Sequence, residues 1–159
     1  NALLLLESWT VPPGVDAAGV FDVDRCSAWI EQGLALLDQA GRSAIGRQYI
    51  GHVLTYTPAG DQGWPAPEIA DLIERLADDN IDKGIEIHTH NRRDVTVRGL
   101  TDGGAQEWAL VTEHRAAAQR MRDSHPRVAR IHYSIADSYA ARARDEDADA
   151  ELTRRGLDR

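Results

Sequence analysis

Apolar residues recur every three or four positions in four stretches of the chain, which predicts helices with one apolar face. The first is 22–41, where an aspartate can cap the start and Gly41 can end the helix in a left-handed conformation. The second is 67–80, where Pro67 suits the first turn. The last two are 103–123 and 124–156. The short break between them, with Ser124 as the expected cap, predicts an antiparallel helical hairpin.

Three other stretches have the pattern of strands. Residues 3–10 (LLLLESWT) are apolar and end before a Pro-Pro-Gly turn, and residues 47–58 (RQYIGHVLTYTP) carry bulk on both faces. Residues 84–99 alternate between apolar and polar, which predicts a β-hairpin with a loop at 91–93. The element order β-α-β-α-β-β, followed by two helices, predicts an α+β fold. We expect a small mixed sheet and a C-terminal antiparallel helical hairpin.

The length and the apolar content fit a single domain, because 159 residues with 42% hydrophobic side chains can bury a sizeable core. We expect residues 3–102 to hold the sheet and 103–156 the helical hairpin, with Asn1 and Ala2 left by cloning. The apolar run at 3–6 is too short for a signal peptide or a membrane span. A single cysteine excludes an internal disulfide and fits a cytoplasmic protein.

The charge is distributed unevenly along the chain. Residues 1–102 hold 8 Lys and Arg against 16 Asp and Glu, whereas residues 103–159 hold 10 of each sign. Nucleic acids are bound by clustered positive charge, so this acidic balance argues against general nucleic-acid binding. No feature of the chain favours a membrane partner.

The predicted 84–99 hairpin holds the main candidate site. Two imidazoles at i and i+2 on a strand, such as His88 and His90, can share a metal ion. A third ligand would have to come from His52, Asp94 or a distant carboxylate. The alternative is a solvated strand face on which His90 is hydrogen-bonded to Asp94, and this is the interpretation that the weak local motif favours.

Two arginines lie at the tip of the same hairpin, with a third nearby. Guanidinium groups suit an acidic partner or a phosphate, but such residues also simply keep a turn soluble. The candidate binding residues are therefore His88, His90, Arg92, Arg93 and Arg98. We assign no catalytic residue, no metal and no cofactor.

The remaining candidates are more simply explained by packing or solvation. Cys26 lies on the apolar stripe of the first helix and is expected in the core rather than as a nucleophile. His114 is expected at a helix interface, and His125 and His132 on the flanks of the last helix. The acidic run at 145–151 lacks the central glycine of a calcium loop and is expected to be a solvated helix.

Three segments resemble a group of uncharacterised actinobacterial proteins: WPAPEIADLIE, GIEIHTHNRRDVTVRGLTDGGAQE and SHPRVARIHYSIADSYAARARDEDADAE. That group shares a similar hairpin, a DGG turn and a long final helix rich in Arg, Asp and Glu. The resemblance covers about residues 60–156. It implies a bacterial source and a compact domain, and it brings no activity and no catalytic residue.

The sequence favours a non-catalytic intracellular interaction or regulatory domain over an enzyme, because none of the common phosphate-binding, nucleophile or zinc motifs is present. We expect a protein partner, or self-association through the helical hairpin, whose seam includes Ile131 and Ile135. One alternative is a small metal-dependent or carboxylate-based hydrolase that uses the polar face of the 84–99 hairpin. Another is an immunity-type protein that neutralises a basic toxin.

Overall fold

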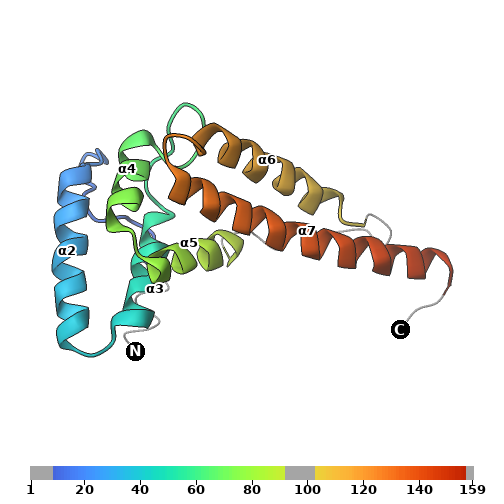
Figure 1. The fold of residues 1–159 in the computed structure, drawn as a ribbon, viewed down its shortest axis with the longest axis horizontal. Helices are drawn as coiled ribbons and strands as arrows, with labels where there is room; N and C mark the ends of the chain where they lie inside the picture. The colour runs from blue at the N-terminus through green and yellow to red at the C-terminus, as the bar shows by residue number, and fades with distance from the viewer. Residues whose placement is uncertain (1–8, 92–102, 157–159) are drawn as a thin grey trace. The chain divides into compact units, whose positions relative to one another are not determined.

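The computed structural model describes residues 9–91 and 103–156, and these residues form helices and no sheet (Figure 1). The only pairings of extended backbone in these residues are isolated bridges, between residues 15 and 21 and between 60 and 63. The predicted α+β fold with a mixed sheet is therefore wrong. The helices are α2 (Val23–Gln39), α3 (Ser43–Leu54), α4 (Pro67–Leu76), α5 (Asp79–Asn91), α6 (Ala105–Met121) and α7 (Pro126–Arg154).

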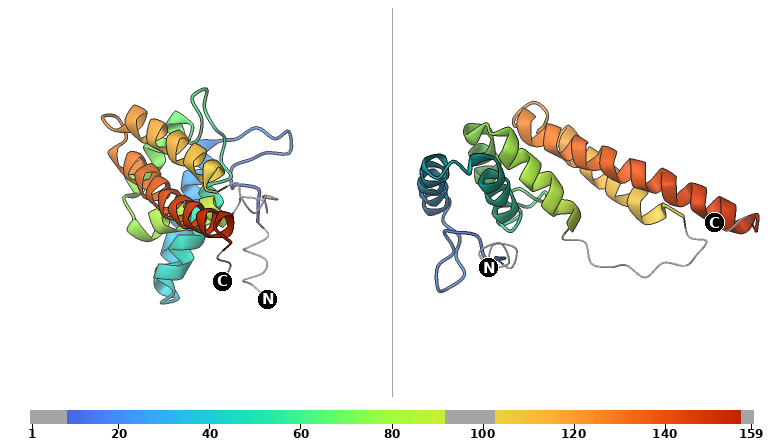
Figure 2. Two further views of the ribbon diagram at one scale, coloured as in Figure 1. Left: turned by 90° about the vertical axis from the view of Figure 1, so that its right-hand side faces the viewer. Right: turned by 90° about the horizontal axis from the view of Figure 1, so that it is seen from below.

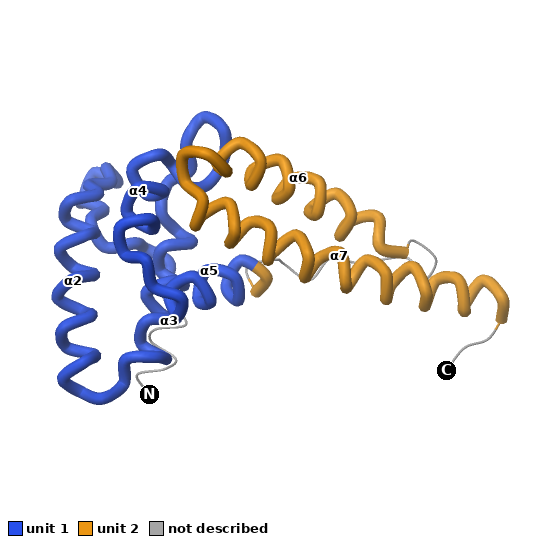
Figure 3. Tube along the Cα trace, viewed as in Figure 1, with its two compact units in different colours: residues 1–89 blue, residues 90–159 orange. Residues whose placement is uncertain are grey.

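The chain divides into two compact units, residues 1–89 and residues 90–159 (Figure 3). Unit 1 contains α2, α3, α4 and α5 as far as Thr89, and unit 2 contains α6 and α7. The expectation of a single domain stays a prediction. Each unit is described by itself below.

The helices predicted at 22–41 and 67–80 are confirmed as α2 and α4. Asp22 caps α2, because its side-chain oxygen accepts hydrogen bonds from the backbone N–H groups of Asp24 and Arg25. Gly41 follows the helix with a φ of 65°, in the left-handed region where glycine is favoured. α4 begins with Pro67 and buries one apolar stripe.

The strand predicted at 47–58 is wrong, because Ser43–Leu54 is helix α3. Its buried apolar residues Ile50, Val53 and Leu54 follow helical spacing. The helix is enclosed on more than one side, so bulky residues occur all round it and imitate a strand that is covered on both faces. Its Gly51 lies against the backbone of α5, where an added Cβ would be 2.8 Å from the nitrogen of Ile85.

The first strand of the 84–99 hairpin is also wrong, because Asp79–Asn91 is helix α5. Asp78 caps this helix by accepting hydrogen bonds from the N–H groups of Asn80 and Ile81, at 2.9 and 3.1 Å. Ile81 and Ile85 lie one turn apart and are buried. The second strand of the hairpin lies outside the described residues. So do residues 3–8 of the strand predicted at 3–10.

The predicted helical hairpin is confirmed by α6 and α7, which run antiparallel and side by side in both views of Figure 2. The seam residues of α7 are buried: Val128, Ile131, Ile135, Tyr139 and Ala143. Gly104, at the start of α6, lets α6 and α7 approach closely, because an added Cβ would be 2.6 Å from the Cα of Ala143. α7 continues to Arg154, with Ala150 buried.

Two details of this hairpin differ from the prediction. Residue 125, and not Ser124, occupies the cap position of α7, and the Ser124 hydroxyl instead lies 2.9 Å from Nδ1 of His125. His132 is 4% exposed and therefore belongs to the interior rather than to a flank.

None of the helices in the described residues has the length and apolar character that crossing a membrane requires.

Candidate functional site

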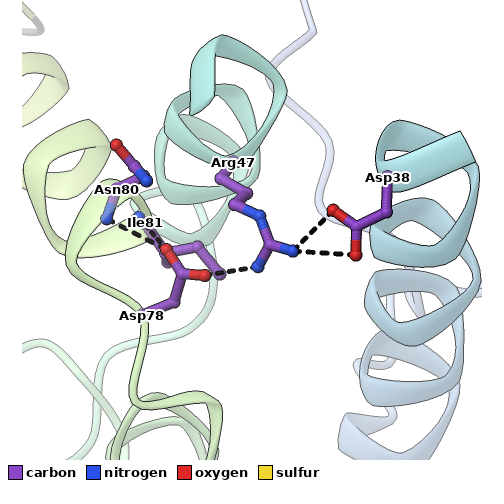
Figure 4. Close-up of polar contacts among 5 residues, drawn as sticks. All are labelled: Asp38, Arg47, Asp78, Asn80 and Ile81. Carbon is purple, nitrogen blue, oxygen red and sulfur yellow. Dashed lines mark hydrogen bonds and ion pairs between the residues drawn. The ribbon is translucent and has the colours of Figure 1, made fainter. Parts of the chain in front are cut away.

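Within unit 1, an arginine bridges two helices and a helix cap (Figure 4). The Arg47 guanidinium on α3 donates to both carboxylate oxygens of Asp38 on α2, at 2.8 and 3.1 Å, and to Asp78. Asp78 in turn caps α5. Hydrogen bonding to Asp38, and then to Asp78, raises the pKa of Arg47 above its ordinary value. This bridge fixes the ends of α2, α3 and α5 with respect to each other.

Unit 1 also contains a group of four rings, here called the unit-1 ring cluster: Tyr49, His52, Tyr56 and His88. The imidazoles of His52 and His88 are stacked, with ring centroids 3.8 Å apart and planes inclined by 9°. Tyr49 lies 6.5 Å from His52 and 6.3 Å from His88, and Tyr56 lies 5.4 Å from His52. The cluster therefore packs the side chains of α3 against α5.

A second group of rings belongs to unit 2, here called the unit-2 ring cluster: His90, His114, His132 and Tyr139. His114 on α6 and His132 on α7 face each other, with their Nδ1 atoms 2.9 Å apart. The ring of Tyr139 lies 5.8 Å from His114 at an angle of 24°, and 4.4 Å from His90. The cluster therefore joins α6 to α7 through rings that are buried or half-buried.

Burial changes the proton affinity of one ring in this second cluster, His114. Desolvation lowers the pKa of His114 below its ordinary value, and the nearby carboxylate of Glu113 opposes that shift only in part. Further along the hairpin, Asp147 on α7 accepts hydrogen bonds from the N–H of Gly104 at 2.8 Å and from Nε1 of Trp108 at 2.9 Å. These two bonds lower the pKa of Asp147, so this carboxylate stays charged and holds the start of α6.

Among residues 9–91 and 103–156, no three His, Cys, Asp or Glu side chains gather in a way that could hold a metal ion. Cys26 is fully buried, as the sequence predicted, and burial raises the pKa of its thiol to about 11. A buried thiol of that pKa is a poor nucleophile. What the clusters offer chemically is proton sharing and ring packing.

The structure places the predicted site residues in different surroundings. His88 stacks on His52 in unit 1, whereas His90 lies against Tyr139 in unit 2. Because α5 is a helix, side chains at i and i+2 point to nearly opposite sides, and the strand geometry that would have let His88 and His90 share an ion is absent. The other candidates, Arg92, Arg93 and Arg98, lie outside the described residues, as does Asp94.

The sequence left most of the ring residues unassigned. Tyr49, His52 and Tyr56 recur at i, i+3 and i+7, a helical stripe that would have been visible had 47–58 not been assigned to a strand. The expected interface position of His114 agrees with its contact to α7. Its partner could not be found from the sequence, because the match between His114 and His132 depends on the register of the hairpin.

Comparisons of the chain with family models, with curated proteins and with solved structures find no match.

Proposed function

We propose that the chain is a non-catalytic protein-interaction module, and that unit 1 binds a basic surface of a partner protein. The charge of unit 1 carries this proposal: residues 1–89 hold 5 Lys and Arg against 14 Asp and Glu, whereas residues 90–159 hold 13 against 12. The acidic character of the chain is thus concentrated in one compact unit. Such a field attracts a basic partner and speeds its association.

The turn between α2 and α3 supplies an apolar contact within this acidic unit. We call residues 35–45 the α2–α3 corner. Its Leu36 and Ile45 are 65% and 57% exposed, and the alanines at 35, 40 and 44 are exposed as well. The corner is held in shape by the Asp38–Arg47 ion pair and by Leu37, which packs on the backbone of Gly46. Apolar side chains on a fixed framework can bury area without a large cost in chain ordering.

The seam of the helical hairpin is a weaker candidate for the contact. Ile131 and Ile135, which the sequence offered for pairing with a partner or a second copy, are each 1% exposed within the chain. A partner could reach them only if that packing opened. The α2–α3 corner therefore replaces the seam as the proposed contact.

The test compares capture of proteins from a lysate of the source cells by three purified baits: wild type, Leu36→Glu/Ile45→Glu, and Val20→Glu as control. Val20 is 62% exposed and lies in a different loop, so its replacement adds the same kind of charge outside the corner. We expect a basic protein bound by wild type and by the control, and at least about ten-fold less of it on the double variant.

Two results would overturn the proposal: no protein whose capture depends on the corner, or a captured protein that is acidic. Circular dichroism of the double variant must match that of wild type, so that loss of binding is not loss of fold. An immunity-type role is a special case of this proposal, in which the basic partner is a toxin. Its mark would be that the captured protein inhibits growth when produced alone.

A further inference from the structure

The two histidines that join α6 to α7 are aligned for a hydrogen bond between rings. Their Nδ1 atoms are 2.9 Å apart and their ring centroids 5.2 Å apart. The distance between the ring centres exceeds the distance between the Nδ1 atoms by about two imidazole ring radii. This is the difference expected when both Nδ1 atoms lie on the line that joins the ring centres. The lone pair of one ring therefore points straight at the Nδ1 of the other. This contact requires one proton between the two nitrogens, with an N–H on one ring and a lone pair on the other.

The same alignment argues against a shared metal ion. A tetrahedral or octahedral ion would lie to the side of the line between the two nitrogens, and both lone pairs would converge on it. Here the lone-pair directions oppose each other, and no third His, Cys, Asp or Glu of the described residues completes a site. A shared proton fits the geometry and a metal does not.

We propose that the His114–His132 pair is an acid-sensitive latch: it holds α6 to α7 while one Nδ1 proton is shared between the rings, and it opens when both rings become imidazolium. In the doubly protonated pair both Nδ1 atoms carry N–H groups that face each other, so the hydrogen bond is lost. Two positive charges then stand side by side in a half-buried site. The proposal goes beyond the proposed function and does not depend on it.

Several titratable groups lie near the pair on both helices. On α6, Glu113 precedes His114, and Glu107 lies two turns earlier with 1% of its surface exposed. On α7, the ring of Tyr139 stacks near His114, and His90 lies on Tyr139. A carboxylate favours imidazolium, yet desolvation outweighs Glu113 and the pKa of His114 is lowered.

The sign of the pH dependence follows from this lowered pKa. In the unfolded chain His114 takes up a proton near pH 6.5, its ordinary value, whereas in the folded chain it stays neutral to lower pH. The unfolded state then binds more protons, so stability rises with pH in this window. The contribution of the latch is fully present above about pH 6.5 and is lost as the pH falls below that value.

Opening the latch would change the surface of the hairpin. His132 is 4% exposed and follows Ile131 directly on α7, and Ile135 lies one turn further on. Separation of α6 from α7 at His132 would therefore uncover apolar side chains that are buried at neutral pH. Acid would turn a closed helical hairpin into one with an accessible apolar seam.

The direct test is nitrogen-detected NMR of the histidine rings in the full chain. At pH 7.5 we expect one of the two Nδ1 atoms to be protonated and the other to have the shift of an unprotonated nitrogen. Below pH 6, both should become protonated only together with loss of the native resonances of α6 and α7. Two native-state imidazolium rings at pH 5, or two unprotonated Nδ1 atoms at pH 7.5, would overturn the proposal. This readout needs no variant.

Variants give a second readout. Asparagine places its amide where Nδ1 of histidine lies and does not titrate, so His114→Asn keeps a hydrogen-bonding group in the latch. The number of protons taken up on unfolding is obtained from urea unfolding between pH 5 and 7.5. We expect it to fall by about one in His114→Asn and to stay unchanged in the control His125→Asn. The His52–His88 stack lies in unit 1 and contributes equally to all variants. An unchanged count in His114→Asn would contradict the latch.

Discussion

At the scale of single residues, burial decides the chemistry of the one cysteine. Cys26 is 0% exposed, and burial raises the pKa of its thiol from 9.0 to about 11. Since the thiolate is the reactive form, this shift alone reduces the reactive fraction about a hundredfold, and burial blocks access as well. We expect N-ethylmaleimide at pH 7.5 to label native protein at least about a hundred times more slowly than protein in urea, as followed by mass spectrometry. Equal labelling rates in buffer and in urea would show that the thiol is exposed.

At the scale of elements, close contact between two helices in unit 1 depends on glycine. An added Cβ at Gly51 on α3 would lie 2.8 Å from the nitrogen of Ile85, and one at Gly84 on α5 would lie 2.7 Å from the carbonyl carbon of Gln48. Backbone atoms cannot move aside as a flexible side chain does, so the helices must separate. We expect Gly51→Ala to lower the free energy of unfolding by about 2–3 kcal/mol in urea titrations.

The matched control for that substitution is Gly33→Ala on α2. Nothing lies within 4 Å of a Cβ at Gly33, and the residue sits in the interior of a helix. Alanine restricts the unfolded chain more than glycine does, so this variant should gain about 0.5–1 kcal/mol. A neutral or stabilising Gly51→Ala would mean that α3 and α5 are not in backbone contact.

The same elements show what the sequence could and could not predict. Helices with one apolar stripe, such as α2, α4 and the α6–α7 hairpin, follow from periodicity, and the start of α2 also follows from its Asp22 cap. α3 is enclosed on more than one side, so its local pattern imitates a covered strand, and the close approach of α3 and α5 at Gly51 and Gly84 is not visible in that pattern. The predicted sharing of a metal ion by His88 and His90 also assumed a strand. Both residues lie on helix α5, where side chains two positions apart point to nearly opposite sides. The pairing of His114 with His132 depends on how α6 and α7 align along the hairpin, which neither helix shows by itself.

At the scale of the whole molecule, the uneven charge sets how the protein responds to salt. Residues 1–89 carry nine more acidic than basic side chains (14 against 5), and many of the acidic ones, such as Asp24 and Asp61, are exposed. Their repulsion favours expansion of unit 1 and is screened when the Debye length falls from about 30 Å at 0.01 M salt to about 8 Å at 0.15 M. The Arg47 bridge is less affected, because the side chains of Arg47 and Asp78 are only 19% and 16% exposed. Screening of repulsion should therefore outweigh screening of attraction.

We expect the Tm of the full chain, followed by circular dichroism at pH 7.5, to rise by a few degrees between about 0.01 and 0.15 M sodium chloride. The variant Asp61→Lys tests the cause, because it changes an exposed loop residue and lowers the net negative charge of unit 1 by two. Its Tm should be higher than that of wild type at low salt, and the rise on adding salt should be smaller. A Tm that falls with salt would mean that attractive ion pairs dominate the electrostatics of unit 1.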